Sequence, residues 1–391
     1  MGWLALLILE KGQCEGLTTG VSTEKQTPTS FLFPYILGLT AEFWGHRRHR
    51  FYFSLFMKKF LISLVMLLNL SVAGLFAQSS LIATLSHGDN ISMYYGVNAL
   101  VQALEAAVSG DVISLSGGTF NATNIRKAVS IRGAGIDESL PTCITGEFSL
   151  DLPENEMNKL QVEGVRCFNK FYLKNSKGRT VYFTKCHLQE TEFKNTDISA
   201  IFTNCIINSV IDYNSTNGLC KVQFHNCVVF NVSLRRYMYS WVNCILNIYP
   251  GQSYWDLNFN NSQLLNCVIY SQLPYQKHNL SSSCIATNCV AVNLRDDFFN
   301  SQTSNSGNYH SSFEKLFKDF TGENTKNQKF ELTDEAKAKF LGTDSTEVGW
   351  YGGAFPYTSI PSYPRITKMN VANKSTADGK LSVEIEVSAA K

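Results

Sequence analysis

The sequence of 391 residues has little charge, little proline and almost no net charge. Charged residues make up 17% of it, where an ordinary globular protein has about a quarter. The formal net charge of +2 supplies no basic field, so nucleic acid is not expected as a partner. The low proline content excludes collagen-like and proline-rich linker proteins. With 44% hydrophobic and 12% aromatic residues, the chain instead has the material for a large buried core.

The first part of the chain contains a pattern typical of an export signal. Met57-Lys58-Lys59 precedes an apolar run that ends in small residues at Ala77. A basic start, an apolar stretch and a small-residue end predict a signal peptide over 57–77. A transmembrane anchor is the alternative, but polar residues interrupt the run and no basic cluster follows it. We therefore expect a secreted or cell-envelope protein with no stable membrane span after cleavage.

Residues 1–56 precede the predicted signal peptide. Because a signal peptide acts at an N-terminus, we interpret them as an over-extended, unstructured start, with a genuine extension as the alternative. Without residues 1–77, the chain carries 27 basic and 28 acidic residues and a net charge of −1. The small positive charge of the whole sequence therefore belongs to its first part.

A cysteine recurs at a nearly regular spacing in the middle of the chain. Seven such cysteines follow one another at intervals of roughly 20 residues, the length of a short solenoid repeat. Apolar residues follow most of them in short runs, and asparagine directly precedes five of the seven. These positions, which we call the ladder, are Cys167, Cys186, Cys205, Cys227, Cys244, Cys267 and Cys289, with Asn204, Asn226, Asn243, Asn266 and Asn288.

Short β-type runs that recur with such a period are typical of a solenoid. Leucine-rich repeats share the period, but their LxxLxLxxN motif is absent, and a helical repeat needs longer amphipathic stretches. We therefore predict an all-β parallel β-helix with the cysteines stacked inward and the asparagines at tight corners. Thiols stacked ~4.8 Å apart on parallel strands lack the twist of a disulfide, so the ladder should stay reduced. A pairing among Cys143, Cys220 and Cys284 stays open.

The two ends of the predicted solenoid carry patterns of their own. Residues 95–109 have helical spacing, with Asn98 as candidate N-cap and Gly110 as candidate C-cap, and GDVISLSGGTF follows. Near the other end stands LGTDSTEVGWYGGAFP, at 341–356. Together these segments resemble the cap and closing segment of secreted bacterial right-handed parallel β-helix proteins of the pectate-lyase-like superfamily, in a non-catalytic or uncharacterised branch.

That resemblance implies a domain plan and a handedness. We expect a right-handed parallel β-helix over 78–356, with a helical cap at 95–109. The tail at 357–391 contains period-two alternation, as in LSVEIEVS, and is expected to form a short β-strand appendage. The oligomeric state is left open by these patterns.

Catalytic motifs of glycoside hydrolases with this fold are nearly missing. Asn195-Thr196-Asp197 and Asp296-Asp297 match two of their strings, but the carboxylates lie several turns apart, where neighbouring turns are needed. The GHG and RIK strings are absent. We therefore lean against an enzyme, and we expect no metal or other cofactor.

Aromatic and charged residues recur 8 to 12 positions after the ladder cysteines, where a solenoid brings them to one side. Such a face can stack on sugar rings, so non-catalytic binding of a polysaccharide or host glycan is the leading hypothesis. The alternatives are a polysaccharide lyase or glycoside hydrolase, and a structural stalk or adhesin module. The candidate ligand-binding residues are Tyr237, Tyr239, Tyr254, Trp255, Tyr275 and His278, and the catalytic candidates, in the enzyme alternative, are Arg235, Arg236 and Asp256.

Overall fold

The structure, a computed structural model, describes the chain from Leu81 onward, with gaps. The predicted start (1–56) and signal peptide (57–77) lie outside the described residues. Those residues are 81–136, 141–153, 159–176, 179–194, 198–212, 221–233, 238–248, 259, 262–275, 279–280, 283–299, 306–319, 329–371, 375–376, 378–380 and 382–388.

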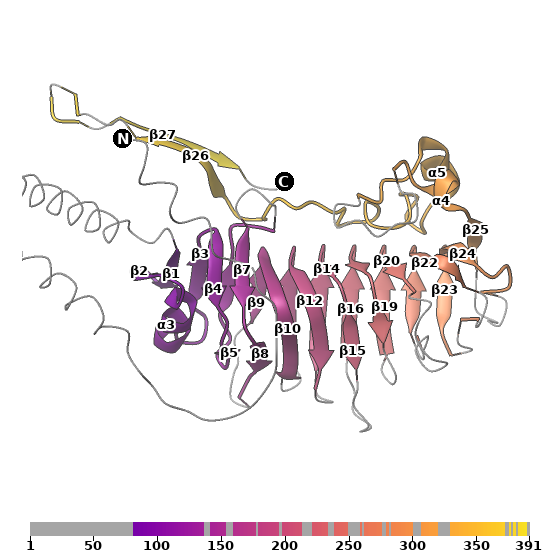
Figure 1. Cartoon of the computed structure of the whole chain (residues 1–391), viewed down its shortest axis with the longest axis horizontal. Coiled ribbons are helices and arrows are strands. Elements are labelled where there is room, and N and C mark those ends of the chain that lie inside the picture. Colours follow the sequence, from indigo (N-terminus) through magenta and orange to yellow (C-terminus); the bar gives the residue numbers. More distant parts are fainter. Residues whose placement is uncertain are drawn as a thin grey trace, which may run out of the picture. The chain divides into compact units, whose positions relative to one another are not determined.

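The described residues form a parallel β-solenoid of about seven regular turns (Figure 1). Each turn runs from a strand of sheet A round a tight corner to a strand of sheet B. In both sheets, strands from successive turns pair in parallel. The predicted all-β parallel solenoid is therefore confirmed, and its right hand stays a prediction.

Sheet A begins with an antiparallel hairpin, β2 and β1, on which β3 and the later strands stack in the order of the turns. Its strands are β1 (Ile82–His87), β2 (Asn90–Tyr95), β3 (Val112–Leu115), β6 (Ser130–Arg132), β9 (Gln161–Glu163), β11 (Thr180–Thr184), β13 (Ser199–Thr203), β16 (Lys221–His225), β19 (Met238–Val242), β21 (Gln263–Leu265) and β23 (Ile285–Thr287).

Sheet B follows the same stacking from β4 to β25. Its strands are β4 (Gly118–Asn121), β5 (Asn124–Ile125), β7 (Thr142–Thr145), β8 (Phe148–Asp151), β10 (Val165–Asn175), β12 (His187–Phe193), β14 (Ile206–Ile207), β15 (Val210–Asp212), β17 (Val228–Val229), β18 (Val232–Ser233), β20 (Ile245–Asn247), β22 (Val268–Tyr275), β24 (Val290–Leu294) and β25 (Tyr309–Ser311).

The helix α3 (Ala99–Ala106) lies inside the predicted cap at 95–109 and buries Leu100 and Leu104. Asn98 is its N-cap residue, as predicted. The side chain of Asn98 makes no capping hydrogen bond and instead accepts one from Asn121 Nδ2 at 2.7 Å. The helix ends at Ala106 with Ala107 as its C-cap, so the prediction of Gly110 as C-cap is wrong and Gly110 belongs to the following loop.

The interior is a stack of aromatic rings beside a stack of thiols. The rings of Phe183, Phe202, Phe224 and Trp241 lie on successive strands of sheet A with centroids 4.0 to 5.0 Å apart, nearly parallel. All seven ladder cysteines are buried, and each of the nine described cysteines, Cys143 and Cys284 included, is a free thiol. Four successive turns contribute a ring, and Leu264 and Ala286 take the same place in the two turns after Trp241. Each turn therefore buries its inner face only against its neighbours.

The corners before the ladder cysteines have left-handed backbone. The five predicted asparagines all have φ between 49° and 57°, and Lys185 takes the same place before Cys186 with φ 50°. Asparagine tolerates this conformation better than other non-glycine residues. Each corner also donates its backbone N–H to the next turn, as Asn204 does to the His225 carbonyl at 3.0 Å.

Beyond sheet B the chain forms two short helices, α4 (Phe313–Leu316) and α5 (Asp334–Lys339). It then runs back along the row of corners as a segment that we call the strap, residues 341–363. Asn288 donates to the Leu341 carbonyl, and Asn226 donates to the carbonyls of Trp350 and Gly352. Further along, Lys185 donates to the Ile360 carbonyl at 2.6 Å. The strap is therefore held along the row of corners by hydrogen bonds from the corner side chains to its backbone carbonyls.

The strap and the two helices cover part of the outward face of sheet B. Val228, Ile245, Val268 and Val290, one after each of four ladder cysteines, are buried on that side. They lie in one apolar cluster with Leu316, Phe317, Phe330, Leu332, Ala336, Phe340, Val348 and Trp350. Sheet B is thus buried on both faces in its later turns, as its runs of consecutive apolar residues require.

The tail contains the two-stranded antiparallel hairpin of β26 (Arg365–Val371) and β27 (Val383–Ser388) (Figure 1). It pairs with no other strand among the described residues. It begins two residues after the strap ends at Tyr363, and its short strands lie in the region where the sequence predicts a β-strand appendage.

Candidate functional site

Most residues of the predicted ligand-binding face lie outside the described residues. These are Arg235, Arg236, Tyr237, Tyr254, Trp255, Asp256 and His278. The backbone of Tyr275 ends β22, and its side chain is not described. That face stays a prediction.

Tyr239 is described, and its side chain lies inside the solenoid. Only 2% of it is exposed. Its hydroxyl donates to Oδ2 of the buried Asp212 at 3.3 Å, and its ring centroid is 6.4 Å from that of Trp241. Tyr239 and Trp241 are two positions apart on β19, so the alternation of a strand directs both inward. The prediction that Tyr239 contacts a ligand at the surface is therefore wrong.

The described residues offer a different polar face, on a third row of strands. The pairing of β10 with β12 shifts register between Cys167 and Lys170, so each of these strands continues past an irregularity. The continuation of β10 pairs with β8, and that of β12 pairs with β15. Phe171 and Thr191 point inward in this row, so the residues on either side of them point outward.

Five outward side chains form what we call the charged cluster: Lys170, Tyr172, Glu190, Glu192 and Lys194. Lys170 Nζ lies 2.6 Å from Glu190 Oε1 and 4.0 Å from Glu192 Oε2. Lys194 donates to Glu192 Oε1, and its ammonium lies 4.9 Å from the centre of the Tyr172 ring. Two carboxylates, two ammonium groups and one aromatic ring therefore share one patch of two adjacent turns.

Glu192 is the centre of this patch. Its side chain is almost fully buried, yet it contacts both lysines, which are about half exposed. The two ammonium groups compensate its charge, which would otherwise be costly to bury. Its neighbour Glu190, through a hydrogen bond, raises the pKa of the Lys170 ammonium. The patch thus holds fixed donors and acceptors beside a ring, the combination that can stack on a sugar and bind its hydroxyl groups.

The sequence contained a signal for this patch that our spacing rule missed. Lys-Phe-Tyr-Leu-Lys at 170–174 and Glu-Thr-Glu-Phe-Lys at 190–194 both carry a charged residue or tyrosine at every second position. Both segments begin soon after a ladder cysteine, before the more distant band of positions that we considered. Lys194 alone falls in that band. The irregularity that separates the two parts of each strand is what displaces the face.

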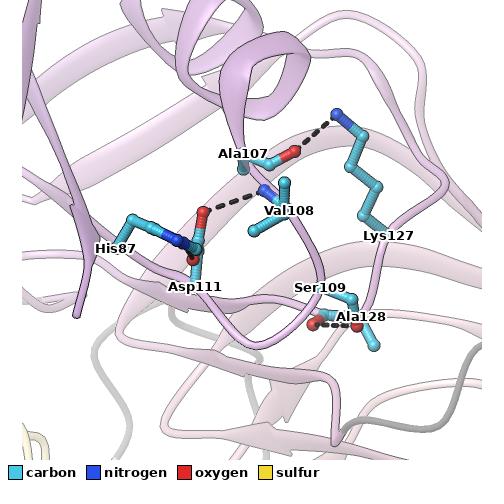
Figure 2. Close-up of polar contacts among 7 residues, drawn as sticks. All are labelled: His87, Ala107, Val108, Ser109, Asp111, Lys127 and Ala128. Carbon is cyan, nitrogen blue, oxygen red and sulfur yellow. Dashed lines mark hydrogen bonds and ion pairs between the residues drawn. The ribbon is translucent and has the colours of Figure 1, made fainter.

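Figure 2 shows a second polar group, at the cap end of the solenoid. The nearly buried Asp111 accepts a hydrogen bond from the Val108 backbone at 2.8 Å and lies 2.6 Å from His87 Nδ1. Lys127 donates to carbonyls at the end of α3, including that of Ala107 at 2.6 Å. A histidine oriented by a carboxylate is one part of a hydrolytic triad, but the described contacts of His87 include no serine or cysteine. We interpret the group as a closure of the α3 C-terminus.

No group of three or more histidine, cysteine or acidic side chains in the described part is arranged to hold a metal ion. Burial raises the pKa of the Cys167 thiol to about 12 and raises that of Cys289 as well, so these thiols are poor ligands and poor nucleophiles. None of the described helices is long and apolar enough to cross a membrane.

Comparison with known proteins finds no matching family model, no similar curated protein and no similar solved structure. The class of the chain is therefore the one defined by its own geometry, a parallel β-solenoid with free inward thiols and a strap over its corners.

Proposed function

We propose that this chain is an exported cell-envelope or extracellular protein that binds a polysaccharide or host glycan without cleaving it. We further propose that the solenoid is right-handed and related in architecture to the pectate-lyase-like superfamily. The sequences of its cap and of its closing segment, which resemble those of that superfamily, support this. The predicted signal peptide at 57–77 supports export.

The observation that carries the proposal is the charged cluster. Its groups lie on the outward side of two adjacent turns, and Tyr172 is flanked by the ammonium of Lys194. The ring supplies a stacking surface, and Lys170, Glu190 and Glu192 supply donors and acceptors held in place by each other. Successive sugars of a linear glycan repeat along a chain, as the turns of a solenoid repeat along its stack.

A polysaccharide lyase or glycoside hydrolase is the second candidate, and one observation favours it. Glu190 and Glu192 both lie within reach of the Lys170 ammonium, so two carboxylates are close together on one face. Glycoside hydrolysis uses such a pair, and a lysine can take the proton in a lyase. Against this candidate, Glu192 is almost buried and neutralised by two lysines.

The test is a polysaccharide array probed with the exported protein, scored for retention and for release of reducing or unsaturated ends. We expect retention without release, and about a 5- to 30-fold loss of affinity in Tyr172→Ala, since loss of a stacked ring removes on the order of 1–2 kcal/mol. Trp255→Ala tests the face predicted from the sequence in the same assay.

A matched control exists on the other sheet. Lys159 lies 4.1 Å from the centre of the Tyr182 ring, so Tyr182→Ala removes the same kind of lysine-flanked tyrosine from another face. Retention that Tyr182→Ala abolishes and Tyr172→Ala leaves intact would place binding elsewhere. Product release that is lost in Glu190→Gln would make the protein an enzyme. Absence of both retention and release across the array would leave a stalk or adhesin module.

A further inference from the structure

The first strand pair of the solenoid leaves an apolar face uncovered. Ile91, Met93 and Tyr95 alternate along β2, so they point to one side, and each is between 46% and 65% exposed. β2 is the last strand of sheet A on that end in the described part of the chain. Exposed edge strands usually carry charge or proline as a protection against pairing, and Asn90–Tyr95 contains neither.

The tail hairpin has a second uncovered apolar face. Val383, Ile385 and Val387 alternate along β27 and are between 49% and 59% exposed. In the hairpin register they stand opposite Val371, Met369 and Ile366 of β26. A two-stranded hairpin is at best marginally stable alone in water, and it requires another surface against its apolar side.

The two faces belong to the same end of the solenoid. Tyr363, two residues before the hairpin, donates its hydroxyl to the Gly133 carbonyl, and its ring lies 5.5 Å from the Arg132 guanidinium. Arg132 ends β6, which is three strands from β2 in the order β6-β3-β1-β2. At ~4.8 Å per strand, the hairpin is therefore rooted ~14 Å from the β2 edge. Both faces are nonetheless exposed at once, so the hairpin does not cover β2 of its own chain.

We propose that a second copy of this chain covers both faces, with the hairpin of each copy lying on β2 of the other. A two-fold axis makes every such contact occur twice, so one pair of complementary faces builds the whole interface. The exposed parts of the six side chains on β2 and β27 amount to on the order of 600 Å² per chain, and a stable interface buries ~800 Å² per partner. The remaining area comes from the backbone edges of the two strands.

The polar side of the hairpin fits this arrangement. Glu384 and Glu386 lie between the three apolar residues of β27 and point to the opposite side, where both are exposed. With the apolar side on β2 of the partner copy, these carboxylates stay in solvent. The apolar sides of both elements carry no charge that docking would bury.

Light scattering coupled to gel filtration, followed by sedimentation over a range of concentrations, tests the interface on the full exported chain. The wild-type protein is expected at twice the mass of one chain. Met93→Glu and Ile385→Lys should each raise the dissociation constant of the dimer by at least about tenfold, as truncation of central apolar contacts does. The double variant, in which the new charges face each other across copies, should recover most of the lost affinity.

Controls on the same strands separate the interface from general effects of charge. Ser92→Glu lies between the apolar residues of β2, and Glu384→Lys lies between those of β27, and both should remain dimeric. All four positions are exposed, so the melting temperature of each variant should stay near that of the wild type when all are measured at a concentration low enough to be monomeric. A monomeric wild-type protein, controls as disruptive as the test variants, or a double variant no better than the single ones would overturn the proposal.

Discussion

The outward face of sheet B differs between the two ends of the solenoid, although the repeat is the same. In the early turns the residue after the ladder cysteine is Phe168 or His187, both partly exposed, and the charged cluster lies beside them. In the later turns it is Val228, Ile245, Val268 or Val290, all buried under the strap and its helices. The inner faces share the stack of thiols, one per turn, whereas the ring stack spans only the four middle turns from Phe183 to Trp241. The residue after each cysteine therefore divides the molecule into an open half and a covered half.

The largest effect should come from placing a charge in the covered half. Val268→Asp is expected to reduce the free energy of unfolding by about 3–5 kcal/mol, since it buries an uncompensated charge. Phe168→Asp, at the matching position of the open half, should change it by less than about 0.5 kcal/mol. Urea unfolding of both variants measures the difference. Equal losses in the two would show that the halves are not distinguished by the strap.

A shared response of the two halves to alkaline pH is the next largest effect. Burial raises the pKa of Cys167 in the open half to about 12, and it also raises that of Cys289 in the covered half. The unfolded thiol loses its proton near pH ~8.5, whereas the folded thiol keeps it. Each thiol therefore stabilises the fold fully below pH ~8.5, and that contribution declines as pH rises toward the folded value, by about 2 kcal/mol at pH 10.

The comparison is between Cys167→Ala and Cys289→Ala. In both variants the free energy of unfolding should decrease less between pH 8 and pH 10 than in the wild type, and by the same amount. Urea unfolding midpoints measured across this pH range test this. A smaller decrease confined to one of them would mean that burial does not keep the other thiol protonated in the folded protein.

Corner asparagines give a smaller effect that isolates the strap itself. Asn226→Gly removes two hydrogen bonds to the Trp350 and Gly352 carbonyls, at 2.9 and 2.6 Å, while glycine keeps the left-handed backbone. We expect a loss of about 1–2 kcal/mol, because buried carbonyls lose their donors. Asn204→Gly is the control, since Oδ1 of Asn204 has no hydrogen-bond partner among the described residues. A calorimetric scan that finds both variants equal would contradict the docking of the strap at Asn226.

The smallest effect on stability should follow a change in the charged cluster. Lys170→Ala removes an ion pair at the surface of the open half, so the free energy of unfolding should fall by less than about 1 kcal/mol. The difference should shrink further at 1 M salt, where the Debye length is ~3 Å. A loss of several kcal/mol that salt does not reduce would mean that the cluster holds the fold together rather than facing a ligand.

The fold class was readable from the sequence because it repeats. A recurring Cys with a preceding Asn marks one position of one turn, and the physical demands of a tight corner and a small inward residue leave few alternatives. The burial of Val228 on the outer side was also within reach, since Val228 and Val229 are consecutive apolar residues and imply two buried faces. The segment that covers that face could not be predicted, because the strap contacts the corners through residues that lie far away in the sequence.

The candidate site was less readable for the same reason. The register irregularity after Cys167 has no distinctive residue, so counting from the cysteine missed the outward residues Lys170, Tyr172 and Glu190. The face that the count predicts lies mostly outside the described residues and stays a prediction. Tyr239 was misplaced because an inward and an outward tyrosine look alike unless the strand register is known. Trp241, two residues later and part of the ring stack, was the residue that could have set that register.

The strap also sets an order of events for a chain that emerges from its N-terminus. Turn-to-turn pairing joins residues close in the sequence, so each turn can add to the one before it as soon as it appears. The strap joins residues 124 apart at Asn226 and Trp350, and 230 apart at Gly133 and Tyr363. Until those last residues arrive, the valines of the later turns face solvent on a growing stack, which is the period in which an incomplete chain is most prone to aggregate. Docking of the strap is therefore the step that buries the outward apolar residues of the later turns and completes folding.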